Sequence, residues 1–163
     1  MQRATEIIQR ADRYKLVAGI GHARTELNAF DAALVAAKVG NYNLLRVSSI
    51  YPPACQPADQ LEPLPGSPLT IAYGFVVVAE PGIRISAAVS VGIPHDPTLP
   101  GVIMEYSQHG MLTDTTAMVR SMAEDAMRLR GTAIKQILDM GQETLSKEGA
   151  TAVFAGVALW KAV

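Results

Sequence analysis

Cysteine is nearly absent from this chain, in which Cys55 is the only example among 163 residues. No disulfide can therefore form within the chain, which is typical of proteins in a reducing compartment. Residues 1–14 mix charged and apolar residues and contain no apolar core of a secretory signal. We expect a cytoplasmic protein.

The chain also lacks a large net charge, because its 14 basic and 15 acidic residues leave a net charge of −1. Such a chain attracts neither nucleic acid nor an anionic membrane surface, so we expect no partner of either kind. The longest mainly apolar run, residues 150–160, is too short to cross a bilayer. No metal-ligand spacing links His22, His95 and His109, and we expect no metal site.

Apolar residues, by contrast, are plentiful and make up 49% of the chain. A chain of this length and composition predicts a single domain over residues 1–163. Six of the ten prolines fall within residues 51–68, which predicts a long ordered loop rather than a linker between domains.

The residue pattern predicts an α+β protein. One helix is expected to begin at an N-cap at Asn28 and to end at Gly40, and a second to run from a cap at Asp114 to Leu129. The strands do not alternate regularly with these helices, which disfavours a doubly wound parallel sheet. Residues 132–148 fit either type of element. Strands are expected over residues 15–19, 44–50, 69–79, 83–93, 101–107 and 150–160.

Two adjacent serines, Ser48 and Ser49, close the predicted strand over residues 44–50. Pro52 and Pro53 follow them and force the chain out of a sheet, because proline has no N–H to donate. A buried hydroxyl costs free energy unless it forms a hydrogen bond. By itself the pair fits either a solvent-facing strand end or a functional site.

Segments along most of the chain carry a family resemblance. Together with Ser48-Ser49-Ile50 and Pro52-Pro53, they are similar to the pyruvoyl-dependent arginine decarboxylases. The resemblance implies a four-layer αββα sandwich of two central sheets covered by helices. It also implies a homo-oligomer, a trimer or a dimer of trimers, with active sites between protomers. The further matching segments are residues 16–19, 27–34, 40–44, 70–74, 85–90, 101–106 and 158–160.

The chemistry of such an enzyme starts from a serine. Loss of CO2 from an amino acid leaves a carbanion, so the enzyme needs a carbonyl that forms a Schiff base with the substrate amine. The resemblance implies that Ser49 attacks the carbonyl of Ser48 and becomes a pyruvoyl group, with no need for pyridoxal phosphate or metal. The chain would be processed to a β chain, residues 1–48, and an α chain, residues 49–163. Its reaction would convert L-arginine to agmatine and CO2.

Two polar residues are candidates for this chemistry. Glu105 ends an apolar stretch, and a buried carboxyl there would hold a proton and act as an acid. A solvent-exposed carboxylate at a strand end explains the pattern equally well. Asn43 is either a turn residue or a donor to the oxyanion formed during cleavage. The resemblance implies the catalytic role for Glu105 and the processing role for Asn43.

Asp31 is expected in the first turn of the first helix, where a carboxylate complements the helix dipole. The resemblance implies that Asp31 also binds the substrate guanidinium, and that Leu27 and Leu34 contact the aliphatic part of the substrate. Two other functions stay open. One is a trimeric binding or structural homologue that is not processed, and the other is a self-cleaving hydrolase with residue 49 as its N-terminal nucleophile.

Overall fold

The computed structural model describes residues 9–162, which form an α+β fold with two β-sheets and two helices. The predicted fold class is confirmed. The helices are α1 (Glu26–Ala36) and α2 (Leu112–Leu129). The strands are β1 (Arg13–Ala23), β2 (Asn43–Arg46), β3 (Ile50–Tyr51), β4 (Gln56–Pro57), β5 (Pro68–Val78), β6 (Arg84–Pro94), β7 (Gly101–His109), β8 (Ile134–Leu145) and β9 (Ala150–Trp160).

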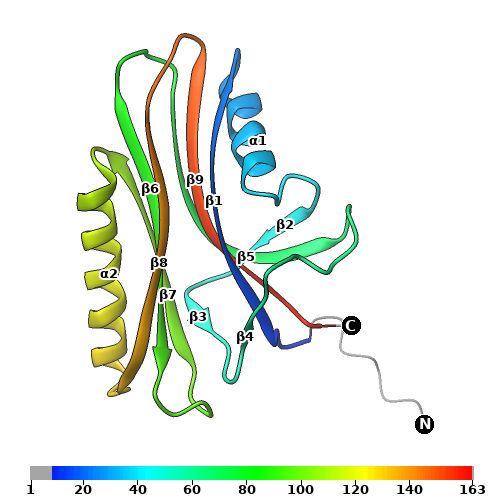
Figure 1. Ribbon diagram of the computed structural model, residues 1–163, viewed down its shortest axis with the longest axis vertical. Helices are drawn as coiled ribbons and strands as arrows, with labels where there is room; N and C mark the ends of the chain where they lie inside the picture. Colours follow the sequence, from blue (N-terminus) through cyan, green and yellow to red (C-terminus); the bar gives the residue numbers. More distant parts are fainter. Residues whose placement is uncertain (1–8, 163) are drawn as a thin grey trace.

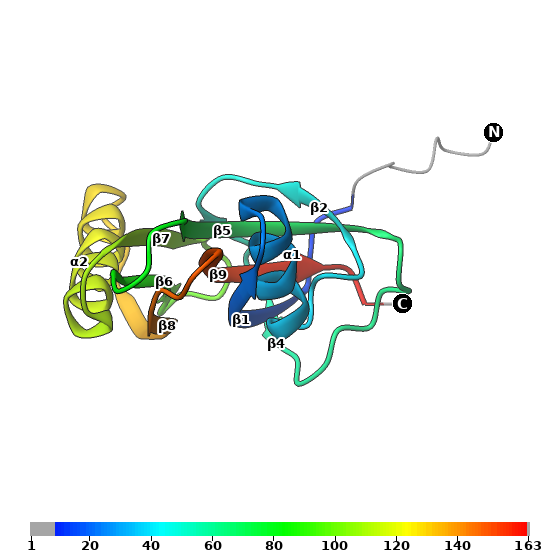
Figure 2. The same ribbon diagram turned by 90° about the horizontal axis from the view of Figure 1, so that it is seen from above.

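The two sheets face one another, and each carries a helix on its outer side (Figures 1 and 2). The first sheet has the strand order β2-β5-β9-β1-β4 and is covered by α1. The second is antiparallel, has the order β3-β7-β6-β8 and is covered by α2. In the part of the chain that the structure describes, no helix is long and apolar enough to cross a membrane.

Strand β9 lies at the centre of the first sheet and is buried along its whole length. Its side chains alternate between two cores. Val153 and Ala155 pack between the sheets, whereas Phe154 packs under α1. An apolar run without polar alternation is what a strand covered on both faces requires. The prediction of a buried strand over residues 150–160 is therefore confirmed.

Helix α1 lies very close to β1 because two glycines of β1 have no side chain. A Cβ atom at Gly19 would come within 2.3 Å of the Ala33 carbonyl oxygen. At Gly21 it would come within 2.1 Å of the Ala29 carbonyl oxygen. These glycines therefore serve helix packing, which depends on the small residues that α1 presents to the sheet.

Both helix starts were predicted wrongly. The N-cap of α1 is Thr25, whose Oγ1 accepts a hydrogen bond from the Asn28 N–H at 3.3 Å. Helix α2 begins after Met111, and Asp114 lies inside its first turn. The Leu112 N–H donates instead to Glu143 Oε2, at 2.5 Å. This capping carboxylate comes from β8, far along the chain, so no local pattern could reveal it.

The predicted strand over residues 44–50 is in fact two short strands in different sheets. Strand β2 ends at Arg46 in the first sheet, and β3 begins at Ile50 in the second. The ambiguous residues 132–148 contain β8, the edge strand of the second sheet. The first strand is longer than expected and covers Arg13–Ala23. Strands β5, β6, β7 and β9 match the predictions within two residues at either end, whereas the short strand β4 lies in the segment predicted to be a loop.

Candidate active site

The Ser48–Ser49 peptide lies where the chain leaves one sheet for the other (Figure 1). On its N-terminal side, the Val47 N–H donates to the Ile71 carbonyl of the first sheet at 3.0 Å. On its C-terminal side, the Ser49 carbonyl accepts from the Ile103 N–H of the second sheet at 2.8 Å. Ser48 is exposed and Ser49 is half-buried. The junction is therefore anchored on both sides, while the serines themselves lie outside regular strand structure.

Glu105 lies on β7, two residues beyond Ile103, the hydrogen-bond partner of Ser49. Side chains two residues apart on a strand share a face, so Glu105 and the buried Ile103 both face the first sheet. The opposing residue on β5 is Gly74, where a Cβ atom would lie only 3.3 Å from the Glu105 Cβ. Gly74 thus leaves the space between the sheets that the glutamate side chain occupies.

The carboxyl group of Glu105 is only partly compensated. Its side chain is 22% exposed, and Oε1 lies 3.8 Å from Arg46 Nη2. Oε2 is buried and has no hydrogen-bond partner among the described residues. Burial raises the pKa of Glu105 above its ordinary value of 4.5, and the Arg46 guanidinium offsets part of that rise. The direction agrees with the sequence-based expectation and suits a group that holds and donates a proton.

Arg46 is the last residue of β2 and covers an edge of β5 that β2 does not reach. Its Nη2 donates to the Tyr73 carbonyl at 2.8 Å. Its guanidinium carbon lies 4.7 Å from the centre of the Tyr73 ring, a cation–π distance. Arg46 therefore connects the edge of the first sheet to Glu105 of the second, two residues before Ser48.

Asn43 does not lie beside Ser48 and Ser49. It begins β2, and the rest of that strand and Val47 lie between it and Ser48. Its Nδ2 donates to the Gly66 carbonyl at 2.7 Å, and its N–H donates to the Ser67 carbonyl at 3.0 Å. Within one chain, Asn43 holds the proline-rich loop against the start of β2.

The three residues predicted to bind substrate lie together on α1, apart from the serines. Leu27 is 74% exposed, Asp31 is exposed, and Leu34 is partly buried against the core beneath α1. Helix α1 covers the outer face of the first sheet, whereas Glu105 points between the sheets. No hydrogen bond or ion pair among residues 9–162 joins Asp31 to Ser49 or Glu105.

Gly74 and Ile103 were not predicted as parts of the site. The signal for Gly74 was present, because a glycine inside a strand rich in β-branched residues often marks close approach of another group. Ile103 had no such signal. It acts through its backbone N–H, and its side chain is an ordinary buried one.

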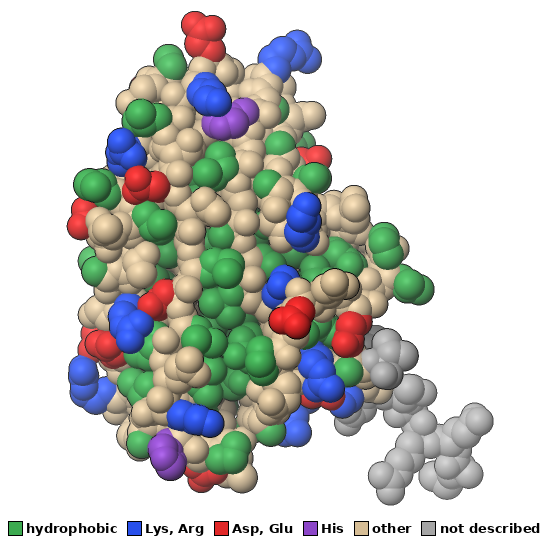
Figure 3. All heavy atoms as spheres, in the orientation of Figure 1, with side chains coloured by type: hydrophobic (Ala, Val, Ile, Leu, Met, Phe, Trp, Pro, Cys, Tyr) green, Lys and Arg blue, Asp and Glu red, His purple; other side chains and the backbone are tan. Residues whose placement is uncertain are grey.

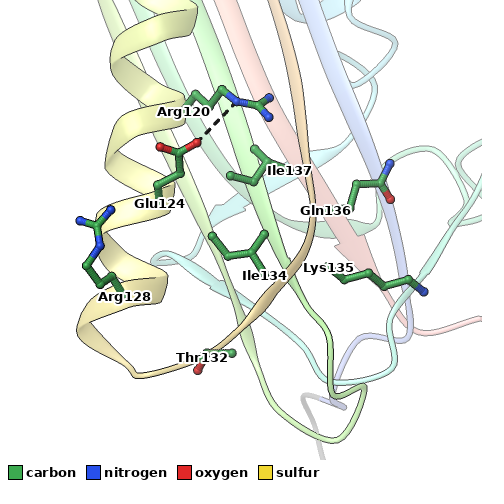
Figure 4. Close-up of a pocket in the computed structure, with 8 residues that line it drawn as sticks. All are labelled: Arg120, Glu124, Arg128, Thr132, Ile134, Lys135, Gln136 and Ile137. Atoms are coloured by element: carbon green, nitrogen blue, oxygen red, sulfur yellow. Dashed lines mark ion pairs between the residues drawn. The ribbon is translucent and has the colours of Figure 1, made fainter.

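One surface hollow borders the candidate site, and another lies apart from it. One, of about 340 Å³, borders the junction and is lined in part by Val47, Ser48 and Ile50. The other, of about 570 Å³, lies between α2 and β8 (Figure 4). Its charges do not converge on a ligand, since Arg120 pairs with Glu124 and Asp139, and Lys135 extends away from the helix. No cluster of potential metal ligands occurs within the described chain.

The raised pKa of Glu105 gives a prediction for stability. The unfolded chain loses this proton as the pH rises through 4.5, while the folded chain keeps it up to a higher pH. Unfolding releases a proton in that interval, so the free energy of unfolding falls as the pH rises and levels off above the pKa of Glu105 in the folded chain.

We expect Glu105→Gln to remove this decline in the free energy of unfolding. Urea unfolding at pH values on both sides of 4.5, in a Ser49→Ala background that keeps the chain intact, measures it. If the free energy of unfolding changed with pH in the same way with and without Glu105, the expectation would be contradicted.

A structural comparison supports the fold. A solved structure of pyruvoyl-dependent histidine decarboxylase at pH 8 matches with a TM-score of 0.51 and 16% sequence identity. The match covers 62% of this chain and 53% of that one, so this chain spans about half of that protein. At this identity the likeness concerns the fold alone.

Sequence comparisons are more specific. The pyruvoyl-dependent arginine decarboxylase of Methanococcus vannielii is 40% identical over 156 residues, which cover 93% of this chain and 92% of that protein. That of Methanocaldococcus jannaschii is 42% identical over 150 residues, covering 89% and 87%. The family model for pyruvoyl-dependent arginine decarboxylase matches residues 13–159. The chain belongs to the pyruvoyl-dependent arginine decarboxylase family.

Proposed function

We propose that this chain is a self-processing pyruvoyl-dependent decarboxylase that converts L-arginine to agmatine and CO2. One observation carries the proposal: the Ser48–Ser49 peptide bridges the two sheets, and Glu105 lies two residues from the hydrogen-bond partner of Ser49. Membership of the family supports the pyruvoyl cofactor, and the names of the relatives support arginine as the substrate.

Self-cleavage would begin when the Ser49 Oγ attacks the carbonyl carbon of Ser48. The C–N bond breaks as an ester forms, and the hydroxyl proton passes to the nitrogen. Loss of the Cα proton of residue 49 then breaks its Cβ–O bond and releases Ser48 as a carboxylate. The remaining enamine takes up water, loses ammonia and leaves the pyruvoyl group on residue 49. The hydrogen bonds of Val47 and Ser49 to opposite sheets would keep both new ends in position.

The residues at the junction fit such a group. Ser49 supplies the necessary hydroxyl on an irregular stretch of backbone, and an unpartnered carboxyl oxygen lies nearby on β7. The pyruvoyl carbonyl would supply the electron sink for loss of CO2. Glu105, in its protonated form, would donate a proton to the substrate α-carbon. Buried neighbours such as Ile103 and Val89 would keep water from competing for that carbon.

Arginine recognition would fall to Asp31, because a carboxylate forms a bidentate pair with a guanidinium. Since Asp31 lies on the outer face of the first sheet, we infer that a second protomer brings its α1 to the junction of the first. The exposure of Leu27 and Val35 on α1 supports a subunit contact there. Hydrophobic side chains also gather at the centre of the face in Figure 3.

The proposed assembly is a trimer, or a dimer of trimers, of single-domain protomers spanning residues 1–163. Each protomer would be a four-layer αββα sandwich, which the packing of one helix outside each sheet supports. We also infer a cytoplasmic location. The lone cysteine is consistent with it, since the chain cannot form a disulfide within itself.

A site shared between protomers predicts complementation. Asp31→Asn and Glu105→Gln should each be poorly active alone, yet co-expression of the two should restore activity. At equal mixing about one quarter of the sites would combine a native Glu105 with a native Asp31 from the neighbour. The decarboxylation rate of mixed assemblies, against each variant alone, measures this. Activity no higher than that of the parents would contradict a shared site.

Asn43 is proposed to assist cleavage by holding the proline-rich loop that follows the junction, or by acting on the junction of a neighbouring protomer. We expect Asn43→Ala to slow the appearance of two chains by about fivefold, the effect of one lost hydrogen bond of about 1 kcal/mol. The fraction that has been cleaved should decarboxylate at an ordinary rate. Gel electrophoresis at intervals after synthesis follows the cleavage. Unchanged cleavage would remove Asn43 from the processing mechanism.

The direct test of function uses arginine labelled at the carboxyl carbon. Purified, cleaved protein should release labelled CO2 and form agmatine in equal amounts. Lysine, which offers a point charge rather than a planar fork, and histidine should react far more slowly. Cleaved protein that releases no CO2 from arginine would refute the assigned substrate.

A further inference from the structure

In the intact chain one charged residue opposes the effect of burial on Glu105. Arg46 is the only charged side chain among the described residues that forms an ion pair with Glu105, at 3.8 Å. The other carboxyl oxygen, Oε2, has no partner there. Because the same Nη2 of Arg46 donates to the Tyr73 carbonyl at 2.8 Å, the guanidinium is shared between the two. Glu105 thus has a single and rather distant counter-charge.

The remaining surroundings of Glu105 are not titratable. Its neighbour on β6 is Val89, and the opposing residue on β5 is Gly74. Along β7, the side chains on the same face are those of Ile103 and Ser107. Burial raises the pKa of Glu105 and Arg46 lowers it. Removal of Arg46 would therefore favour the protonated carboxyl.

Cleavage would create a new anion beside Arg46. In the intact chain the carbonyl of Ser48 is neutral, whereas after elimination it is a terminal carboxylate. An extended chain advances about 3.3 Å per residue, so this group arises about two residues, or 7 Å, from the Arg46 Cα. The Arg46 side chain is 54% exposed and has room to reorient. A terminal carboxylate also accepts two parallel hydrogen bonds from a guanidinium.

We propose that self-cleavage moves the Arg46 guanidinium from Glu105 to the new carboxylate of Ser48 and leaves Glu105 without a charged partner. This inference rests on the proposed function. Before cleavage, Arg46 pairs with Glu105 and opposes the effect of burial on its pKa. After cleavage, the same arginine anchors the end of the β chain, and Glu105 takes up the proton that it donates during decarboxylation. Arg46 is thus a positioning residue that couples self-cleavage to protonation of Glu105.

Carbon-13 NMR of protein labelled at the glutamate side-chain carboxyl tests the proposal without an activity assay. The Glu105 signal is assigned by its loss in Glu105→Gln, and its titration is compared in cleaved wild-type protein and in uncleaved Ser49→Ala. The pKa of Glu105 should be higher in the cleaved protein by on the order of one unit, the effect of losing one nearby opposite charge. Equal pKa values in the two proteins would overturn the proposal.

Arg46→Gln separates this effect from formation of the pyruvoyl group itself. In the Arg46→Gln background, cleavage should raise the pKa of Glu105 less than in the wild type, because only the new Ser48 carboxylate acts on it, whereas Arg46→Lys should retain the full rise. A rise of the same size with glutamine at position 46 would overturn the role of Arg46. Mass spectrometry of the same samples keeps the two claims apart. Wild-type protein that stays a single chain refutes the proposed function, while a cleaved protein without the rise refutes only this inference.

A crystal structure of the cleaved protein is an independent measurement for the case in which Arg46→Gln does not fold or cleave. The Arg46 guanidinium should lie within hydrogen-bond distance of the Ser48 carboxylate and beyond ion-pair distance of Glu105. A guanidinium still paired with Glu105, with the Ser48 carboxylate elsewhere, would overturn the proposal.

Discussion

Replacement of Ser49 by alanine should leave one uncleaved chain with no decarboxylase activity. The side chain of Ser49 supplies both the attacking oxygen and the carbon skeleton of the proposed cofactor, so no other residue can substitute for it. The loss should equal the whole rate enhancement of the enzyme, ~10⁶-fold or more. Electrophoresis under denaturing conditions and release of CO2 from arginine measure the two effects.

Ser48→Ala is the matched control for this experiment. Its position differs by one residue, it is more exposed than Ser49, and the proposed reaction uses only its backbone carbonyl. Ser48→Ala should therefore still give two chains. Two chains from Ser49→Ala would assign the nucleophile to another residue, and a single chain from Ser48→Ala in the same experiment would point to Ser48.

Replacement of Glu105 by glutamine should give the second large effect, with cleavage preserved and decarboxylation strongly reduced. Glutamine has nearly the same shape and still fits opposite Gly74, but it cannot donate a proton in the same way. Removal of a general acid typically costs about 10²- to 10⁴-fold in rate. The rate of CO2 release by the cleaved variant measures this loss.

The control for Glu105→Gln is Ser107→Ala on the same face of β7. The Ser107 hydroxyl donates to the Phe75 carbonyl at 2.8 Å and so connects the same two sheets. Its loss should cost stability without removing an acid, so the cleaved Ser107→Ala protein should keep most of its activity. A Glu105→Gln variant as active as the wild type would exclude Glu105 as the proton donor.

The sequence predicted a strand well where a long apolar run is buried along its whole length, as in β9, which is covered on both faces. It failed between residues 44 and 50, because residues of β2 and β3 look alike although they belong to different sheets. Local pattern can show that the chain leaves a sheet near two prolines. It cannot show that Ile50 and Tyr51, just before those prolines, join the other sheet, since their partners on β7 lie about fifty residues away.

The candidate site was predictable in its residue types but not in its arrangement. Resemblance to a family pointed to Ser49, Glu105 and Asp31, and the structure brings only the first two near one another in a single chain. That Gly74 and Arg46 both contact Glu105 became visible only with coordinates, because both contacts lie between the sheets. Burial of one Glu105 oxygen without a partner likewise has no signature in the sequence.

The most direct measurement of self-processing is the mass of the purified protein under denaturing conditions. Two chains should appear, residues 1–48 and 49–163, with the larger about 17 Da lighter than a fragment that begins with serine, because an amine has become a ketone. Two chains without that deficit would favour a hydrolase with an N-terminal serine. One intact chain would contradict self-processing and leave a binding or structural homologue.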